Sequence, residues 1–120
     1  MGRQYCKMHA ATLLALTALD ANRFVALDGG YATSAGGAKD ALGVSESSAA
    51  IGDAFPVITG FSALVTTGEA IAQHAFVKPA ADGSGKAITG TATDHCGRAM
   101  EAASAAGQLL EIRILPHRHT

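Results

Sequence analysis

The stretch GRAMEAASAAGQLLEIRIL, residues 97–115, decides the fold because its two halves predict different secondary structures. Its middle, residues 100–106, has four alanines, one glutamate and one methionine, all of which favour a helix. Its end alternates, because three aliphatic side chains fall on one face of an extended chain and Glu111 and Arg113 fall on the other. This period of two residues is typical of a half-buried strand.

An earlier stretch, GVSESSAAIGDAFPVIT at residues 43–59, aligns with the first when one gap is allowed. Gly43 then falls on Gly97, and Gly52 falls on Gly107. After the second glycine the same alternation of apolar residues recurs. The alignment indicates that both stretches have the same structure.

Further upstream, an apolar FV pair precedes an Asp-Gly turn signal in both RFVALDGG and AFVKPAADGSG. The two similarities predict an internal repeat over residues 23–59 and 75–114, with chance similarity in a chain rich in alanine and glycine as the alternative. The first copy has SESSAA, a poor helix former, where the second has EAASAA. We therefore expect EAASAAG to be a loop between strands, or at most one helical turn.

The remainder of the chain consists of short apolar segments separated by Gly and Asp-Gly turn signals, a rhythm typical of sandwiches and barrels. We predict an all-β fold: a small barrel or sandwich of short antiparallel strands, built from two duplicated strand-loop-strand halves, with at most one or two short helical turns. The expected strands cover residues 12–19, 23–27, 41–44, 54–58, 62–66, 74–78, 86–89, 97–100 and 109–115.

Two local features refine this prediction. Pro56 indicates an edge strand, because proline has no N–H to donate to a neighbouring strand. Residues 68–73 are compatible with a short helical turn, and residues 31–40 with a surface loop.

A chain of 120 residues is expected to form one domain. We expect an N-terminal arm at residues 1–10, one β-rich domain at residues 11–116 and a C-terminal tail at residues 117–120.

The composition favours a protein partner. Charged residues make up 16% of the chain, below the ~25% of typical soluble domains. No stripe of lysine and arginine is present to neutralise phosphates, so nucleic acid is not expected as a partner. No apolar run reaches the ~20 residues of a membrane span, so no membrane association is expected. A small core often gains stability from oligomers or partners.

The sequence contains no catalytic or cofactor-binding motif. The serines do not lie in a G-x-S-x-G elbow, and the GSGK segment lacks the spacing of a phosphate-binding loop. We predict that the protein is not an enzyme and has no cofactor.

Cysteines and histidines suggest one alternative, a small metal-binding protein. Zinc binds sets of such side chains. Adjacent residues of a strand point to opposite faces, so only one of the pair at 95 and 96 could join a site, and no metal ligand is predicted. The residues that the alternative would use are Cys6, His9, His95, Cys96, His117 and His119.

The N-terminus suggests another alternative, a secreted or periplasmic β-domain that binds a protein partner. Arg3 and Lys7 precede the apolar residues 10–19, as in a secretory signal. A cut after Ala21 would, however, place Asp20 in a poor cleavage site.

The ordered set of motifs resembles the small phage capsid decoration, or cement, proteins, a family formerly known as a domain of unknown function. The resemblance covers the chain from about His9 to Pro116. The terminal segments MGRQYCKMH and HRHT and the His95-Cys96 pair depart from it. The matching motifs are RFVALDG, ALGVSESSAAIGDAFPVITG, GFSALVTTGEAIAQHAFV, ADGSGKAI and CGRAMEAASAAGQLLEIRILP.

The resemblance implies a non-enzymatic protein of the virion that is made in the host cytoplasm. It would bind the outer surface of an assembled phage head, bridge major capsid subunits and stabilise the expanded lattice, often as a homotrimer. Chain ends commonly become ordered on a partner, and loops often carry contacts. The expected capsid-contact residues are Arg3, Gln4, Tyr5, Lys7, Tyr31 and Lys39.

Overall fold

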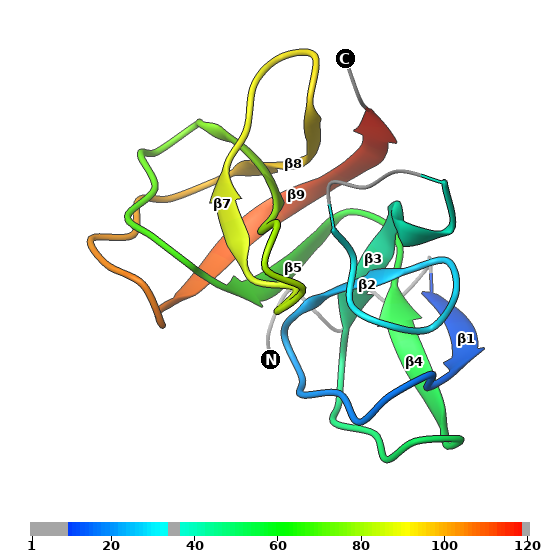
Figure 1. The fold of residues 1–120 in the computed structure, drawn as a ribbon. Helices are drawn as coiled ribbons and strands as arrows, with labels where there is room; N and C mark the ends of the chain where they lie inside the picture. The colour runs from blue at the N-terminus through cyan, green and yellow to red at the C-terminus, as the bar shows by residue number, and fades with distance from the viewer. Residues whose placement is uncertain (1–9, 34–36, 119–120) are drawn as a thin grey trace.

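The protein folds into two antiparallel sheets, as predicted, in a computed structural model that describes residues 10–33 and 37–118 (Figure 1). The four-stranded sheet has the order β1-β4-β3-β2, and the five-stranded sheet has the order β5-β9-β8-β6-β7. The strands are β1 (Ala10–Leu14), β2 (Phe24–Ala26), β3 (Ala41–Ser45), β4 (Ala54–Ile58), β5 (Ser62–Thr66), β6 (Phe76–Pro79), β7 (Ala87–Thr89), β8 (His95–Ala99) and β9 (Leu109–Arg118).

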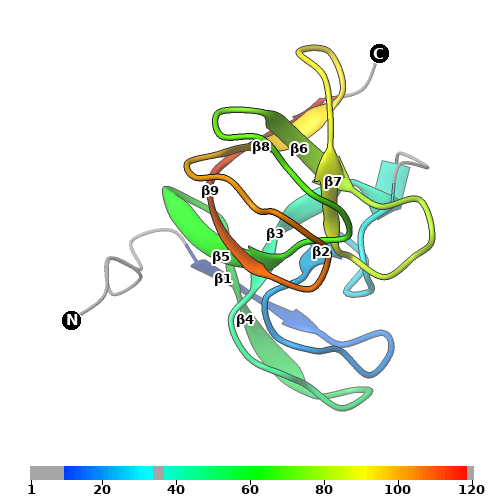
Figure 2. The ribbon, with the colours of Figure 1, turned by 90° about the vertical axis from the view of Figure 1, so that its left-hand side faces the viewer.

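The arrangement is a sandwich rather than a closed barrel. Figure 2 shows the sheets as two stacked halves, with β1 and β4 in one and β6, β7 and β8 in the other. A single parallel bridge between Thr67 and Ala87 joins the edges of the five-stranded sheet. Within the described residues the one helical element is the 3₁₀ helix η2 (Gly37–Lys39). None of the helices in this part of the chain has the length and hydropathy to cross a bilayer.

Both sheets have the same connectivity. In the four-stranded sheet β1 pairs with β4, β4 with β3, and β3 with β2. In the five-stranded sheet β5 pairs with β9, β9 with β8, and β8 with β6. Strands β1, β2, β3 and β4 thus correspond to β5, β6, β8 and β9, and β7 is an addition at the edge. The two stretches aligned from the sequence, residues 43–59 and 97–115, occupy corresponding places in the two sheets.

The loops that follow the strands also correspond. Leu19 and Ala49 exchange two backbone hydrogen bonds of 2.9 and 3.0 Å, and Ile71 and Ala103 exchange two of 2.9 and 2.8 Å. The first pair joins the loop after β1 to the loop after β3, and the second joins the loop after β5 to the loop after β8, the strand that corresponds to β3. In both halves the two loops therefore form a narrow arch of backbone.

Residues with positive φ recur at matching positions. Gly52 and Gly107 have φ values of 84° and 82°, and each donates its N–H to a carbonyl just after the first strand of its half. Asn22 lies three residues after Leu19, and His74 lies three residues after Ile71. Their φ values are 62° and 69°. A backbone in this region is costly for residues other than glycine, so its recurrence marks a turn that both halves need.

Burial of apolar side chains holds the sheets together. The larger core lies between the sheets and joins Phe24, Val44 and Ile58 of the four-stranded sheet to residues of the other sheet, among them Val65 and Leu110. A second core covers the opposite face of the four-stranded sheet. Its buried members are Ala15, Leu19, Val25, Phe55 and Val57.

The conflict within residues 97–115 is resolved as expected. EAASAAG forms a loop, and the alternating segment that follows is β9, with Leu110 and Ile112 buried and Arg113 exposed. The helical turn expected at residues 68–73 is wrong, because the pairing of Ile71 with Ala103 keeps this segment extended. Tertiary hydrogen bonds decide the conformation here.

The prediction that Pro56 marks an edge strand is also wrong. Its strand, β4, lies between β1 and β3. The Pro56 carbonyl accepts a hydrogen bond from the N–H of Glu46, the residue after the end of β3. In an antiparallel pair the N–H and C=O of one residue point the same way. The nitrogen of Pro56, which carries no hydrogen, therefore faces the chain just beyond the end of β3.

The ends of the domain differ from the expected boundaries by one or two residues. Strand β1 begins at Ala10, and β9 continues to Arg118. His117 therefore belongs to a strand rather than to a tail, and its side chain is only 3% exposed. Its Nδ1 accepts a 2.6 Å hydrogen bond from the N–H of Ala41.

Candidate functional site

The structure describes two of the six residues expected to contact a partner. Tyr31 and Lys39 lie on the connection between β2 and β3. The other four, Arg3, Gln4, Tyr5 and Lys7, lie outside the described residues.

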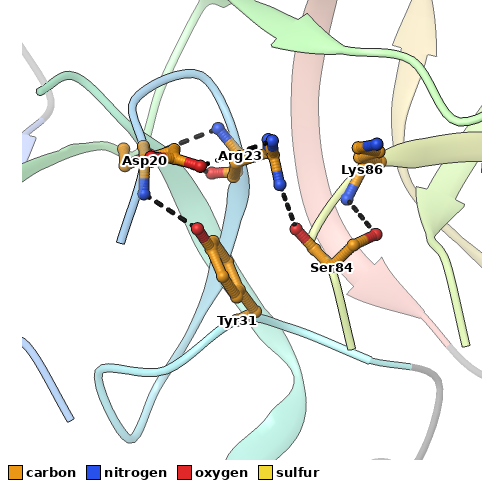
Figure 3. A network of polar contacts seen from close by, with 6 residues as sticks. Asp20, Arg23, Tyr31, Ser84 and Lys86 are labelled. Carbon is orange, nitrogen blue, oxygen red and sulfur yellow. Dashed lines mark hydrogen bonds and ion pairs between the residues drawn. The ribbon is translucent and has the colours of Figure 1, made fainter. Parts of the chain in front are cut away.

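Tyr31 lies in a polar network beside the start of β2 (Figure 3). Its hydroxyl accepts a hydrogen bond of 2.8 Å from the backbone N–H of Asp20. The centre of the Arg23 guanidinium lies 5.7 Å from the centroid of its ring, in the range of a cation–π contact. Tyr31 thus holds the loop before β2 against the loop that follows β2.

Arg23 extends this network to the other sheet. Its Nη1 donates a hydrogen bond of 2.8 Å to the carbonyl of Ser84, in the turn between β6 and β7 (Figure 3). Its Nη2 lies 3.6 Å from a carboxylate oxygen of Asp20. The arginine side chain is 17% exposed. The planar guanidinium has several N–H donors, which suits a partly buried position between the Ser84 carbonyl and the Asp20 carboxylate.

Gly85 makes the close approach of the two sheets possible. Its carbonyl accepts a 2.8 Å hydrogen bond from the N–H of Phe24. A Cβ on Gly85 would lie 2.6 Å from the ring of Tyr31 and 2.7 Å from the carbonyl oxygen of Phe24. Its φ is 71°. Glycine is therefore required here for both space and backbone conformation.

Lys39 is paired within the same connection. Its ammonium lies 2.9 Å from a carboxylate oxygen of Asp28, whose other oxygen accepts the N–H of Gly30 at 2.9 Å. Burial alone would raise the pKa of Asp28, but the hydrogen bonds from Lys39 and Gly30 and the lysine charge offset it, so this pKa is lowered. Lys39 and Tyr31 therefore both help to fix the conformation of the loop.

The structure gives no support to the metal alternative within the described residues, where no cluster of three or more potential ligands is found. Cys96 is buried in the core at 2% exposure, and burial, followed by the charges of Asp94 and Asp40, raises the pKa of its thiol well above the usual value. His95 instead packs on Phe76, with ring centroids 4.5 Å apart. Cys6, His9 and His119 lie outside the described residues.

An exposed face of the five-stranded sheet was not identified from the sequence as a contact surface. It carries Phe76, Arg98 and Arg113 on the three neighbouring strands β6, β8 and β9. Two shallow depressions of about 220 and 360 Å³ lie over it and share Met100 and Arg113 in their linings. The alternation at the end of the chain placed Arg113 outward, but no sequence pattern brought it next to Arg98.

The sequence matches the phage cement protein family over residues 7–114, which span both sheets. The chain belongs to this family. It is accordingly a structural protein of the phage head. No curated protein matches the sequence.

A solved structure has the same fold: the N base of the head fiber gp8.5 of bacteriophage phi29, with a TM-score of 0.62. The two chains are 19% identical, and the match covers 93% of this chain and 98% of the other. At this identity the similarity establishes the fold alone.

Proposed function

We propose that this cement protein binds the outer surface of an assembled phage head and stabilises the expanded lattice by bridging neighbouring major capsid subunits. The observation that carries the proposal is the family match, which extends over both sheets and nearly the whole chain. That a phage head fiber base shares the fold supports it. We propose a homotrimer as the bound form.

The physical basis is preferential binding to one state of the lattice. A ligand that binds the expanded state and not the unexpanded state stabilises the former by mass action. Each copy needs only a modest interface, because many copies act on one shell. Low charge also suits docking, since few charged groups must lose water at the interface.

Several exposed apolar side chains are available for such contacts. Among the described residues the large ones that are at least about half exposed are Leu14, Leu16, Leu27, Ile51, Phe61, Met100 and Leu109. They are distributed over both halves, so contacts with more than one capsid subunit are feasible. The residues predicted from the sequence as contacts, Arg3, Gln4, Tyr5, Lys7, Tyr31 and Lys39, remain part of the proposal.

Co-sedimentation tests the proposal. Purified protein is mixed with expanded heads that lack it and, as a control, with unexpanded shells from the same phage. We expect saturable binding to expanded heads alone, and a higher temperature of head disruption when the protein is bound. Equal binding to both shells, or to neither, would contradict the proposal. A variant without residues 1–8 tests the N-terminal contacts separately.

A further inference from the structure

The correspondence between the two halves identifies a surface that is covered in one sheet and exposed in the other. In the four-stranded sheet, Phe24 lies opposite Val44, and Val44 lies opposite Ile58. All three are at most 8% exposed and form the face that packs against the five-stranded sheet. This face is thus already used for packing within the molecule.

The corresponding positions in the five-stranded sheet are Phe76, Arg98 and Arg113. Phe76 lies opposite Arg98, and Arg98 lies opposite Arg113. Both arginines are exposed. The phenylalanine is retained, whereas two aliphatic residues are replaced by cations. The second half therefore presents to solvent a face of the same geometry that has become basic.

Contacts within the sheet hold Arg98 in place. Its Nε donates a 2.9 Å hydrogen bond to the carbonyl of His74, and its guanidinium carbon lies 4.6 Å from the centroid of the Phe76 ring. Among the described residues, the hydrogen bond of Arg98 uses Nε and neither of the two terminal nitrogens of the guanidinium. A side chain that is already ordered loses less entropy when it binds an anion.

The facing arginines are unfavourable for the isolated protein. Like charges directly opposite on neighbouring strands destabilise a sheet. Within the described residues, the ion pairs of the protein involve neither Arg98 nor Arg113. A carboxylate supplied from outside would relieve this repulsion and could accept hydrogen bonds from both side chains.

Apolar groups border the two arginines. Met100 is 49% exposed and lines both depressions over this face, and Phe61, which is 56% exposed, lines the larger one. Acidic groups lie toward one side, where the Glu101 carboxylate accepts the backbone N–H of Glu111. The surface therefore combines two cations with an adjacent apolar patch, which suits a polypeptide better than a free anion.

We propose that this face, with Arg98 and Arg113 at its centre, docks an acidic segment of the major capsid protein that carries an apolar side chain beside its carboxylates. The inference rests on the proposed function, because it names the surface used for the same partner. Phe76 supports one cation from below, and Met100 and Phe61 receive the apolar side chain.

The test compares three variants with the wild-type chain in the co-sedimentation experiment with expanded heads. Arg98→Glu/Arg113→Glu reverses both charges. Arg98→Lys/Arg113→Lys keeps the charges but loses the planar fork of donors. The control, Lys86→Glu/Arg118→Glu, makes the same change in net charge at residues that do not line the depressions. Thermal melting of each variant verifies that it is folded.

We expect the charge-reversed variant to lose at least tenfold in affinity, the lysine variant to lose less, and the control to bind like wild type. Wild-type binding should also weaken as salt is raised. Equal binding by the charge-reversed variant and the control overturns the docking proposal and leaves the proposed function intact. Failure of the wild-type chain to bind overturns both. Loss of self-association instead of head binding assigns the face to a second copy of the chain and also overturns it.

Discussion

The guanidinium of Arg23 donates a hydrogen bond to the carbonyl of Ser84 across 2.8 Å, and so links the start of β2 to the turn between β6 and β7. Together with the hydrogen bond from the N–H of Phe24 to the carbonyl of Gly85, it joins the two sheets. Together with the core between the sheets, this contact helps to fix the relative position of the two halves.

Replacing Arg23 by methionine is expected to lower the free energy of unfolding by about 2 kcal/mol, because a partly buried carbonyl loses a charged donor while the apolar stem is kept. Urea unfolding followed by circular dichroism measures the change. Arg118→Met is the control, since Arg118 is exposed near the end of β9, and it should change stability by less than about 0.5 kcal/mol. A similar loss in both variants would show that Arg23 does not link the sheets.

Gly85→Ala is expected to destabilise the protein by about 3 kcal/mol or more. Its new methyl group would lie 2.6 Å from the ring of Tyr31 and 2.7 Å from the carbonyl oxygen of Phe24, and its φ is 71°. Gly83→Ala is a matched control, because its φ is 81° but nothing lies within 4 Å of the added Cβ. The control should lose only the ~1 kcal/mol cost of a left-handed backbone. Thermal melting of both variants separates the steric effect from the conformational one.

The corresponding glycines of the two halves give a test of their equivalence. Gly52 and Gly107 have φ values of 84° and 82°, and nothing lies within 4 Å of a Cβ on either. We expect alanine at each position to cost about 1 kcal/mol, and the double variant to cost about the sum. Urea unfolding of the two single variants and the double variant measures this. A cost several times larger at one glycine would show that the two turns are not equivalent.

Much of the fold could be predicted because period-two patterns and turn residues are local signals. The alternation that ends in β9 and the glycine pairs placed strands and loops correctly. The sequence could not predict that Pro56 lies in a central strand. A proline is tolerated there only because of where the neighbouring strand β3 ends. The extended backbone at Ile71 likewise depends on hydrogen bonds to Ala103, which is far away in sequence.

The contact surfaces were less predictable than the fold. The position of Tyr31 and Lys39 in a loop predicts a contact role for them, and the structure gives both of them intramolecular partners. The pairing of Arg98 with Arg113 arises from the register of β8 and β9, which the sequence alone does not specify. A face formed by adjacent strands becomes visible only when the strand order is known.

Cys96 is expected to be unreactive in the folded protein. The residue is 2% exposed, and burial raises the pKa of its thiol, so very little thiolate is present to react. In a Cys6→Ser background, the remaining thiol should react with Ellman's reagent at pH 8 at least a hundredfold more slowly in buffer than in denaturing urea. Rapid reaction in buffer would show that the core around β8 opens readily.

The pair formed by Asp28 and Lys39 is expected to make the stability of the protein depend on pH in the acidic range. The pKa of Asp28 is lowered in the folded protein from its ordinary value of 3.8. The unfolded chain therefore binds this proton more readily, so the pair stabilises the fold above about pH 3.8, and its contribution is lost as the pH falls through the lower folded pKa.

Asp28→Asn keeps an oxygen for the N–H of Gly30 but removes the charge. Because the two side chains are 23% and 41% exposed, we expect a loss of about 0.5 kcal/mol at pH 7. Urea unfolding between pH 7 and pH 2.5 should show this difference shrinking toward zero at the acid end. Lys39→Met should give a similar loss at pH 7, and the double variant should lose little more than either single variant, because the three changes remove one interaction. Additive losses, or a difference that does not vary with pH, would mean that the ion pair is not the source of the stabilisation.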